Sequence, residues 1–115
     1  MSIDEVGRKR IESAVSAYVQ RKRPPVHIRP QLDIGFRIAG QSVEIFERRP
    51  AWKRPAEITE QPVAKATFVK ARDVWKVFWQ RADLKWHSYA PVPTVGSIEK
   101  FLELVDKDPH GCFWG

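Results

Sequence analysis

The sequence is poor in cysteine, in glycine-rich segments and in long apolar runs. Its single cysteine, Cys112, has no second cysteine to join, which excludes an internal disulfide bond. No apolar run exceeds three residues, so no segment is long enough to span a membrane. The glycines are dispersed, and neither a phosphate-cradling glycine loop nor a Gly-x-Ser-x-Gly motif is present. Nucleotide binding through such a loop and serine-hydrolase chemistry are therefore disfavoured.

The same absences lead to an expectation about localisation. Residues 1–5 include no apolar segment behind a basic flank, so we expect no secretory signal. A lone cysteine fits a reducing compartment, and we therefore expect a cytoplasmic protein.

What the chain does contain suits one small folded domain spanning residues 1–115. Hydrophobic residues make up 43% of it, enough to bury a modest core. The formal net charge is +6, and the excess lies in residues 1–54, which hold 12 basic and 6 acidic side chains. Such a balance attracts polyanions, nucleic acid first and anionic membranes second. The alternative is a solvated basic surface that binds nothing anionic.

Two amphipathic helices are predicted, one near each end of the chain. Ser2–Glu5 has the form of a capping box, and apolar residues then recur at helical spacing through residues 11–19. Arg21–Arg23 suits the carbonyl end of this helix, and Pro24-Pro25 ends it. Near the other terminus, Ser97 is placed to cap a second helix. The apolar positions of that helix are Ile98, Phe101, Leu102 and Val105.

Residues 32–49 predict a β-hairpin. Apolar and polar residues alternate along 32–38 and again along 43–47, and Gly40-Gln41 suits the two-residue turn between them. One register brings opposite charges together on the outer face and lays an aromatic ring over a glycine. Its pairs are Ala39 with Ser42, Arg37 with Glu44, Asp33 with Arg48 and Phe46 with Gly35.

Glu47 is the exception on the apolar face of this hairpin, where the register places it opposite Ile34. Carboxylates are rarely buried without a partner. We therefore expect Glu47 to pair with a cation or to lie in an opening, with a strand-end bulge that returns it to solvent as the alternative.

Further strands are expected between residues 62 and 89. The proline-rich segment 50–62 is predicted to be a loop, after which Pro62 begins a strand that runs to Lys70. Val74–Trp79 is the richest β-forming run, and residues 84–89 form a short last strand. The unknown length of the turn near residue 72 leaves open which face carries Trp75 and Trp79. The predicted fold is α+β: an N-terminal helix, a four- or five-stranded antiparallel meander, and a C-terminal helix packed on the sheet.

Four segments resemble a known family: Pro24–Arg29, Pro62–Phe68, Trp75–His87 and Asp106–Gly115. They are similar to small bacterial proteins described only as a domain of unknown function, number three thousand and twenty-four. The resemblance covers nearly the whole chain and implies a bacterial, single-domain, standalone protein. It implies no activity, cofactor or catalytic residue.

Basic residues gather near element ends and in loops around one tryptophan. Cations that contact phosphates and an exposed ring that stacks on bases are what single-stranded nucleic-acid binding requires. We therefore expect a non-catalytic module that binds nucleic acid, single strands favoured, without a cofactor. The alternative is scattered solvated charge. The candidate residues are Arg21, Lys22, Arg23, Arg29, Arg48, Arg49, Trp52, Lys53 and Arg54.

Two other functions stay open, and the oligomeric state is undetermined. A protein-interaction or accessory module would use the exposed face of residues 75–86 as its contact. An enzyme acting on a phosphate-bearing substrate would draw on Glu47, Asp83 and His87 for acid–base chemistry. A turn at residues 81–83 would break the alternation that places Asp83 and His87 on one side of an extended strand, which favours a structural role for Asp83. Metal binding is disfavoured because His110-Gly111-Cys112 lacks a second ligand pair at zinc-finger spacing.

Overall fold

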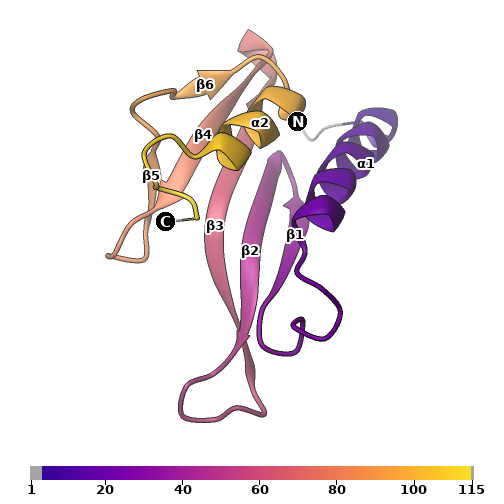
Figure 1. The fold of residues 1–115 in the computed structure, drawn as a ribbon. Helices are drawn as coiled ribbons and strands as arrows, with labels where there is room; N and C mark the ends of the chain where they lie inside the picture. Colours follow the sequence, from indigo (N-terminus) through magenta and orange to yellow (C-terminus); the bar gives the residue numbers. More distant parts are fainter. Residues whose placement is uncertain (1–3, 115) are drawn as a thin grey trace.

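Residues 4–114 are described by a computed structural model, in which two α-helices lie on one face of an antiparallel sheet (Figure 1). The helices are α1 (Glu5–Lys22) and α2 (Ile98–Lys107), and a short 3₁₀ helix, η1, spans Lys70–Arg72. The strands are β1 (Asp33–Ala39), β2 (Ser42–Pro50), β3 (Ile58–Val69), β4 (Val74–Gln80), β5 (Trp86–Ser88) and β6 (Thr94–Val95).

The sheet is a meander in the order β1-β2-β3-β4-β5. Strand β6 also pairs with β4, at Trp75 and Lys76, whereas β5 pairs with β4 at Phe78 to Gln80. Every neighbouring pair is antiparallel. The predicted α+β fold, with a helix at each end of a meander, is therefore confirmed. Strand β6 was not predicted, because Pro91 and Pro93 precede it and it is only two residues long.

The first hairpin has the register that the charge pattern predicts. Ala39 pairs with Ser42 around Gly40, whose φ of 58° is a conformation that glycine adopts without strain. Gly35 pairs with Phe46, and the ring lies so close that a Cβ on Gly35 would be 2.8 Å from Phe46 Cε1. The aromatic ring thus covers the glycine gap, as predicted.

Strand β3 begins four residues earlier than predicted, at Ile58 rather than at Pro62. Pairing continues through Pro50 with Ile58, which leaves residues 51–57 as the loop. Pro62 is tolerated inside the strand because the register shifts beside it, between Ile45 and Phe46 of β2. The result is a long β2–β3 hairpin whose far half extends beyond its neighbours (Figure 1).

The β3–β4 turn decides the faces that the sequence left open. The chain passes through η1, and Asp73 takes a left-handed conformation with φ 51° before β4 begins. This spacing pairs Phe68 with Trp75 and Ala64 with Trp79, so both tryptophans lie on the helix-covered face. Strand β5 is shorter than predicted, covering only Trp86–Ser88, because residues 81–84 form the preceding turn.

Helix α1 begins after a different cap from the one predicted. Asp4 is the N-cap, and its carboxylate accepts a hydrogen bond of 2.6 Å from the Gly7 amide. The predicted cap, Ser2, lies outside the described residues. The helix ends as predicted, with Arg21 and Lys22 in its last turn and Arg23 as the C-cap before Pro24. Its buried residues are Ile11, Val15, Tyr18 and Val19.

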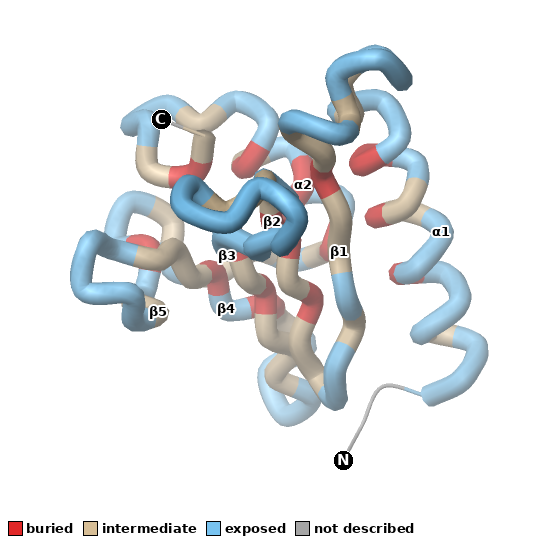
Figure 2. The backbone as a smooth tube through the Cα atoms, turned by 90° about the horizontal axis from the view of Figure 1, so that it is seen from below, coloured by how far each residue is buried: buried red, intermediate tan, exposed pale blue. Residues whose placement is uncertain are grey.

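Helix α2 and the segment after it close the core. Ser97 caps the helix by accepting from the Lys100 amide, and its buried residues are the four that the spacing predicts. Asp108 then accepts from the amides of Phe113 and Trp114, which holds the last segment against the body and buries Phe113. Figure 2 shows the buried positions gathered between the sheet and the two helices, with the hairpin loop in front exposed. Among the described residues, neither helix is long and apolar enough to cross a membrane.

Candidate functional site

The two faces of the sheet differ in what covers them. The helix-covered face supplies the core, while the opposite, outer face carries no helix in the described residues. Because side chains alternate along a strand, every second residue of β1 to β5 reaches this outer face. We call six of them the outer-face cluster: Arg37, Phe46, Arg48, Lys65, Phe78 and Trp86.

One half of the outer-face cluster is built on Phe46. The guanidinium groups of Arg37 and Arg48 lie over the ring, at 4.6 and 5.1 Å from its centroid, and leave the ring 3% exposed. Both arginines also bind the Glu60 carboxylate, and Arg37 lies 3.7 Å from Glu44. Two cations are thus balanced by two carboxylates, and this half carries no net charge.

The other half of the outer-face cluster carries a net positive charge. The Lys65 ammonium lies 4.9 Å from the Phe78 ring centroid and 5.0 Å from that of Trp86. Both rings are half-buried. Across residues 4–114, no carboxylate lies within ion-pair distance of Lys65. The ammonium is therefore held by ring faces and stays available to an anion.

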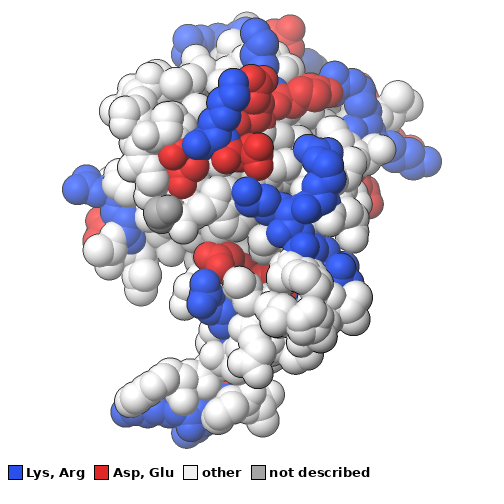
Figure 3. Space-filling model, in the orientation of Figure 1, with Lys and Arg blue, Asp and Glu red and all other residues white. Residues whose placement is uncertain are grey.

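The predicted cluster around Trp52 occupies the projecting half of the β2–β3 hairpin, which we call the arm (residues 48–60). Trp52 is 89% exposed at its tip, and Lys53 lies 5.7 Å from the ring centroid. The arm's three arginines are paired with carboxylates. The pairs are Arg48 with Glu60, Arg49 with Glu47 and Arg54 with Glu57, at 3.4, 2.9 and 3.4 Å. Figure 3 shows basic side chains at the tip of the arm.

The remaining predicted cations lie elsewhere, at the end of α1 and in the loop after it. Lys22 pairs with Asp106 of α2, and Arg29 donates to the carbonyl of Pro24. Arg21 lies over the Tyr18 ring. The nine candidate residues thus lie at the end of α1, in the loop after it and along the arm, and Arg23 adjoins Arg48 through Asp33, which binds Arg23 and pairs with Arg48 in the β1–β2 register.

Arg23 forms an ion pair with Asp33 within the fold. Its guanidinium donates two hydrogen bonds of 2.8 Å to the two carboxylate oxygens of Asp33. This bidentate pair joins the end of α1 to the start of β1. The hydrogen bonds from Arg23 and from the Ile34 amide hold the pKa of Asp33 below its ordinary value.

The three residues predicted for acid–base chemistry do not form one group. Glu47 keeps the predicted position opposite Ile34 and pairs with Arg49, so its cation partner is the one two residues along the strand. Asp83 and His87 come together across the β4–β5 turn, with Nε2 and Oδ2 2.8 Å apart. Hydrogen bonds from the Lys85 amide and from His87 lower the pKa of Asp83. This pair closes the turn.

Sequence reasoning missed Lys65 as a member of a site, and it included Phe78 and Trp86 only within the exposed face of residues 75–86 as a protein contact. The alternation of side chains along β3 and β4 could have identified Lys65 and Phe78 as neighbours. It places them on one face of the sheet only once the length of the turn between the strands is known. Groups of three or more His, Cys, Asp or Glu that would suit a metal ion are absent from the described residues.

Comparison with known families agrees with the resemblance of the sequence segments. Residues 3–115 match a family described as a domain of unknown function, DUF3024. No match was found among curated proteins or solved structures. Because the match extends over nearly the whole chain, the protein belongs to the DUF3024 family.

Proposed function

We propose that this chain is a non-catalytic module that binds single-stranded nucleic acid on the outer face of its sheet. The observation that carries the proposal is the Lys65 ammonium, held between Phe78 and Trp86 without a carboxylate partner in residues 4–114. Half-buried rings on an open sheet offer stacking surfaces that tolerate any base. The ammonium between them supplies a phosphate contact.

The arginine half of the outer-face cluster is open to competition from phosphates. Arg37, Arg48 and their shared partner Glu60 have side chains 47, 48 and 37% exposed. Ion pairs this exposed contribute about 0–1 kcal/mol each, so phosphate oxygens can displace the carboxylate at small cost. We propose a cytoplasmic location, because nucleic acid is present in that compartment and a free cysteine stays reduced there.

The test is a titration of fluorescein-labelled single-stranded DNA and RNA 20-mers, and of a duplex, followed by anisotropy at about 50 and 200 mM salt. Replacing Trp86 by Ala removes a stacking surface worth about 1–3 kcal/mol per base, so affinity is expected to fall about 5- to 150-fold. Replacing Lys65 by Gln is expected to reduce the slope of log affinity against log salt by about one.

Matched controls sit on the arm. Trp52→Ala and Lys53→Gln make the same chemical changes at exposed positions outside the outer-face cluster, and are expected to leave affinity within about twofold. Absence of binding at low salt would refute the proposal. A loss confined to the arm variants would move the interface to the arm.

A second candidate function is protein interaction, which the arm favours. Trp52 and Ile58 are 89 and 58% exposed there. Large apolar side chains exposed together suit a protein contact. Self-association measured by sedimentation, lost in Trp52→Ala, would support this second function.

A further inference from the structure

A cavity lies away from the outer-face cluster, on the helix-covered side. Its volume is about 460 Å³, and it opens where the first turns of α1, the start of α2 and the β3–β4 turn meet. Small-molecule sites have volumes of about 300–1,000 Å³ and are mostly apolar with a few polar groups. The cavity has the size of a site for a small molecule rather than for a polymer.

The floor of the cavity is apolar and aromatic. Phe68 and Trp75 face one another with ring centroids 5.2 Å apart and planes tilted by 48°. Ile11 of α1 and Ile98 of α2 complete the floor. Ile11, Trp75 and Ile98 belong to the buried core and are 6, 5 and 1% exposed. A planar apolar ligand thus meets the half-buried Phe68 ring, which is backed by the buried Trp75 ring.

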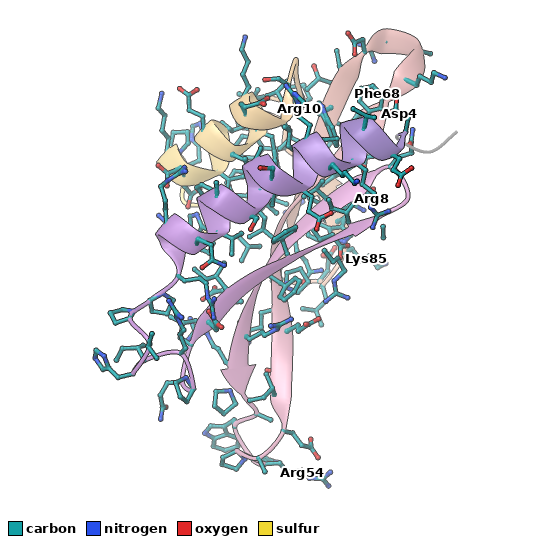
Figure 4. The ribbon with its side chains drawn as sticks, turned by 90° about the vertical axis from the view of Figure 1, so that its right-hand side faces the viewer. Asp4, Arg8, Arg10, Arg54, Phe68 and Lys85 are labelled. Carbon is teal, nitrogen blue, oxygen red and sulfur yellow. The ribbon has the colours of Figure 1, made fainter. Side chains whose placement is uncertain are left out.

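The rim of the cavity carries the cations Arg10 and Lys70 and the carboxylates Asp4 and Asp73, and Arg10 is the cation whose exposed ion pair can change partners. Arg10 of α1 reaches Glu99 of α2 at 3.0 Å, with the two side chains 63 and 53% exposed. So exposed a pair is weak, and a carboxylate placed in the cavity mouth can replace Glu99 on the guanidinium. Asp4, also on the rim, is already engaged as the N-cap of α1. Figure 4 shows Asp4, Arg10 and Phe68 near one another at the upper end of α1.

We propose that this cavity binds a small planar aromatic carboxylate. The ring lies on Phe68 and Trp75, and the carboxylate accepts a bidentate hydrogen bond from Arg10. This site is independent of the proposed nucleic-acid interface, since none of the residues that line the cavity belongs to the outer-face cluster.

The first test compares two probes of one shape. We would measure binding of 1-naphthoate and of the neutral 1-naphthalenemethanol by calorimetry and by the amide shifts of Gly96 and Ser97, which line the cavity. Naphthoate is expected to bind at least about tenfold more tightly, because a charged hydrogen-bonded pair forms only with the carboxylate. Arg10→Gln is expected to abolish that difference. Arg8→Gln, on the same helix but outside the cavity lining, should leave it unchanged.

A second variant blocks the cavity. A Cβ on Gly96 would meet no heavy atom within 4 Å, and the residue is not in a left-handed conformation, so Gly96→Phe places a phenyl ring at the cavity wall without strain. It is expected to abolish binding of both probes, whereas Ala56→Phe in the exposed arm loop should not. Binding that survives in Gly96→Phe would overturn the proposal. So would equal naphthoate affinity in Arg10→Gln and Arg8→Gln, or no saturable binding at millimolar probe.

Discussion

The Phe46 ring lies so close to Gly35 that a larger residue at this position is expected to destabilise the fold. A Cβ on Gly35 would lie 2.8 Å from Cε1 and 3.1 Å from Cζ of Phe46. The ring cannot move aside freely, since it is 3% exposed and lies beneath the guanidinium groups of Arg37 and Arg48. Overpacking of this kind costs about 1–3 kcal/mol. Reduced freedom of the unfolded chain offsets about 0.4–1 kcal/mol of it. We therefore expect Gly35→Ala to lower the free energy of unfolding by about 0.5–2 kcal/mol.

The assay is urea unfolding followed by tryptophan fluorescence, with Gly96→Ala as the matched control. A Cβ on Gly96 meets nothing within 4 Å, so that variant is expected to be neutral or about 0.4–1 kcal/mol more stable. At about 4 °C per kcal/mol for a domain of this size, Gly35→Ala should melt about 2–8 °C lower than the wild type. Adding Phe46→Leu should relieve part of the loss. Equal stability of Gly35→Ala and Gly96→Ala would refute the reasoning.

Two further predictions follow from the titration of single groups. The hydrogen bonds from Arg23 are the main cause that lowers the pKa of Asp33 in the folded protein. The ionised Asp33 therefore stabilises the fold fully above the unfolded-state pKa of about 4. This stabilisation is lost as the pH falls through the lower pKa of the folded state. Asp33→Asn should therefore reduce the free energy of unfolding most near pH 7, and the difference from wild type should shrink below about pH 4; a pH-independent difference would contradict this. Burial raises the pKa of the Cys112 thiol, so the folded protein should react with Ellman's reagent more slowly at pH 8 than it does in guanidinium chloride, and equal rates would exclude the burial effect.

The hairpin shows what short-range pattern is able to predict. The register of the first hairpin runs from Asp33 with Arg48 to Ala39 with Ser42. It is specified by the alternation of apolar and polar residues, by the glycine turn and by opposite charges that face each other on the two strands, because all these contacts lie within one hairpin. The end of α1 and the start of α2 follow for the same reason, since capping and helical spacing are also local. The position of Glu47 opposite Ile34 was predictable for the same reason, since it follows from the register of this hairpin.

Part of the charge arrangement on the arm depends on how far the β2–β3 hairpin continues. The basic residues of the arm were recognisable from sequence, and the pairs of Arg49 with Glu47 and Arg54 with Glu57 are local. Pro62 suggested a loop, and the register shift beside it allows β3 to begin at Ile58. The longer hairpin therefore gives Arg48 a cross-strand partner, Glu60, that the predicted loop did not provide.

By itself, the sequence determined the helices, the first hairpin and the order of a helix, a meander and a helix, because these rest on periodicity and on contacts between near neighbours. Only the tertiary structure decided which faces carry the aromatic residues of β4 and β5. That choice depends on the left-handed turn at Asp73, whose conformation no local pattern specifies. The same long-range packing brings Lys65 between two rings and encloses the cavity above Trp75, since both require elements far apart in the chain to meet.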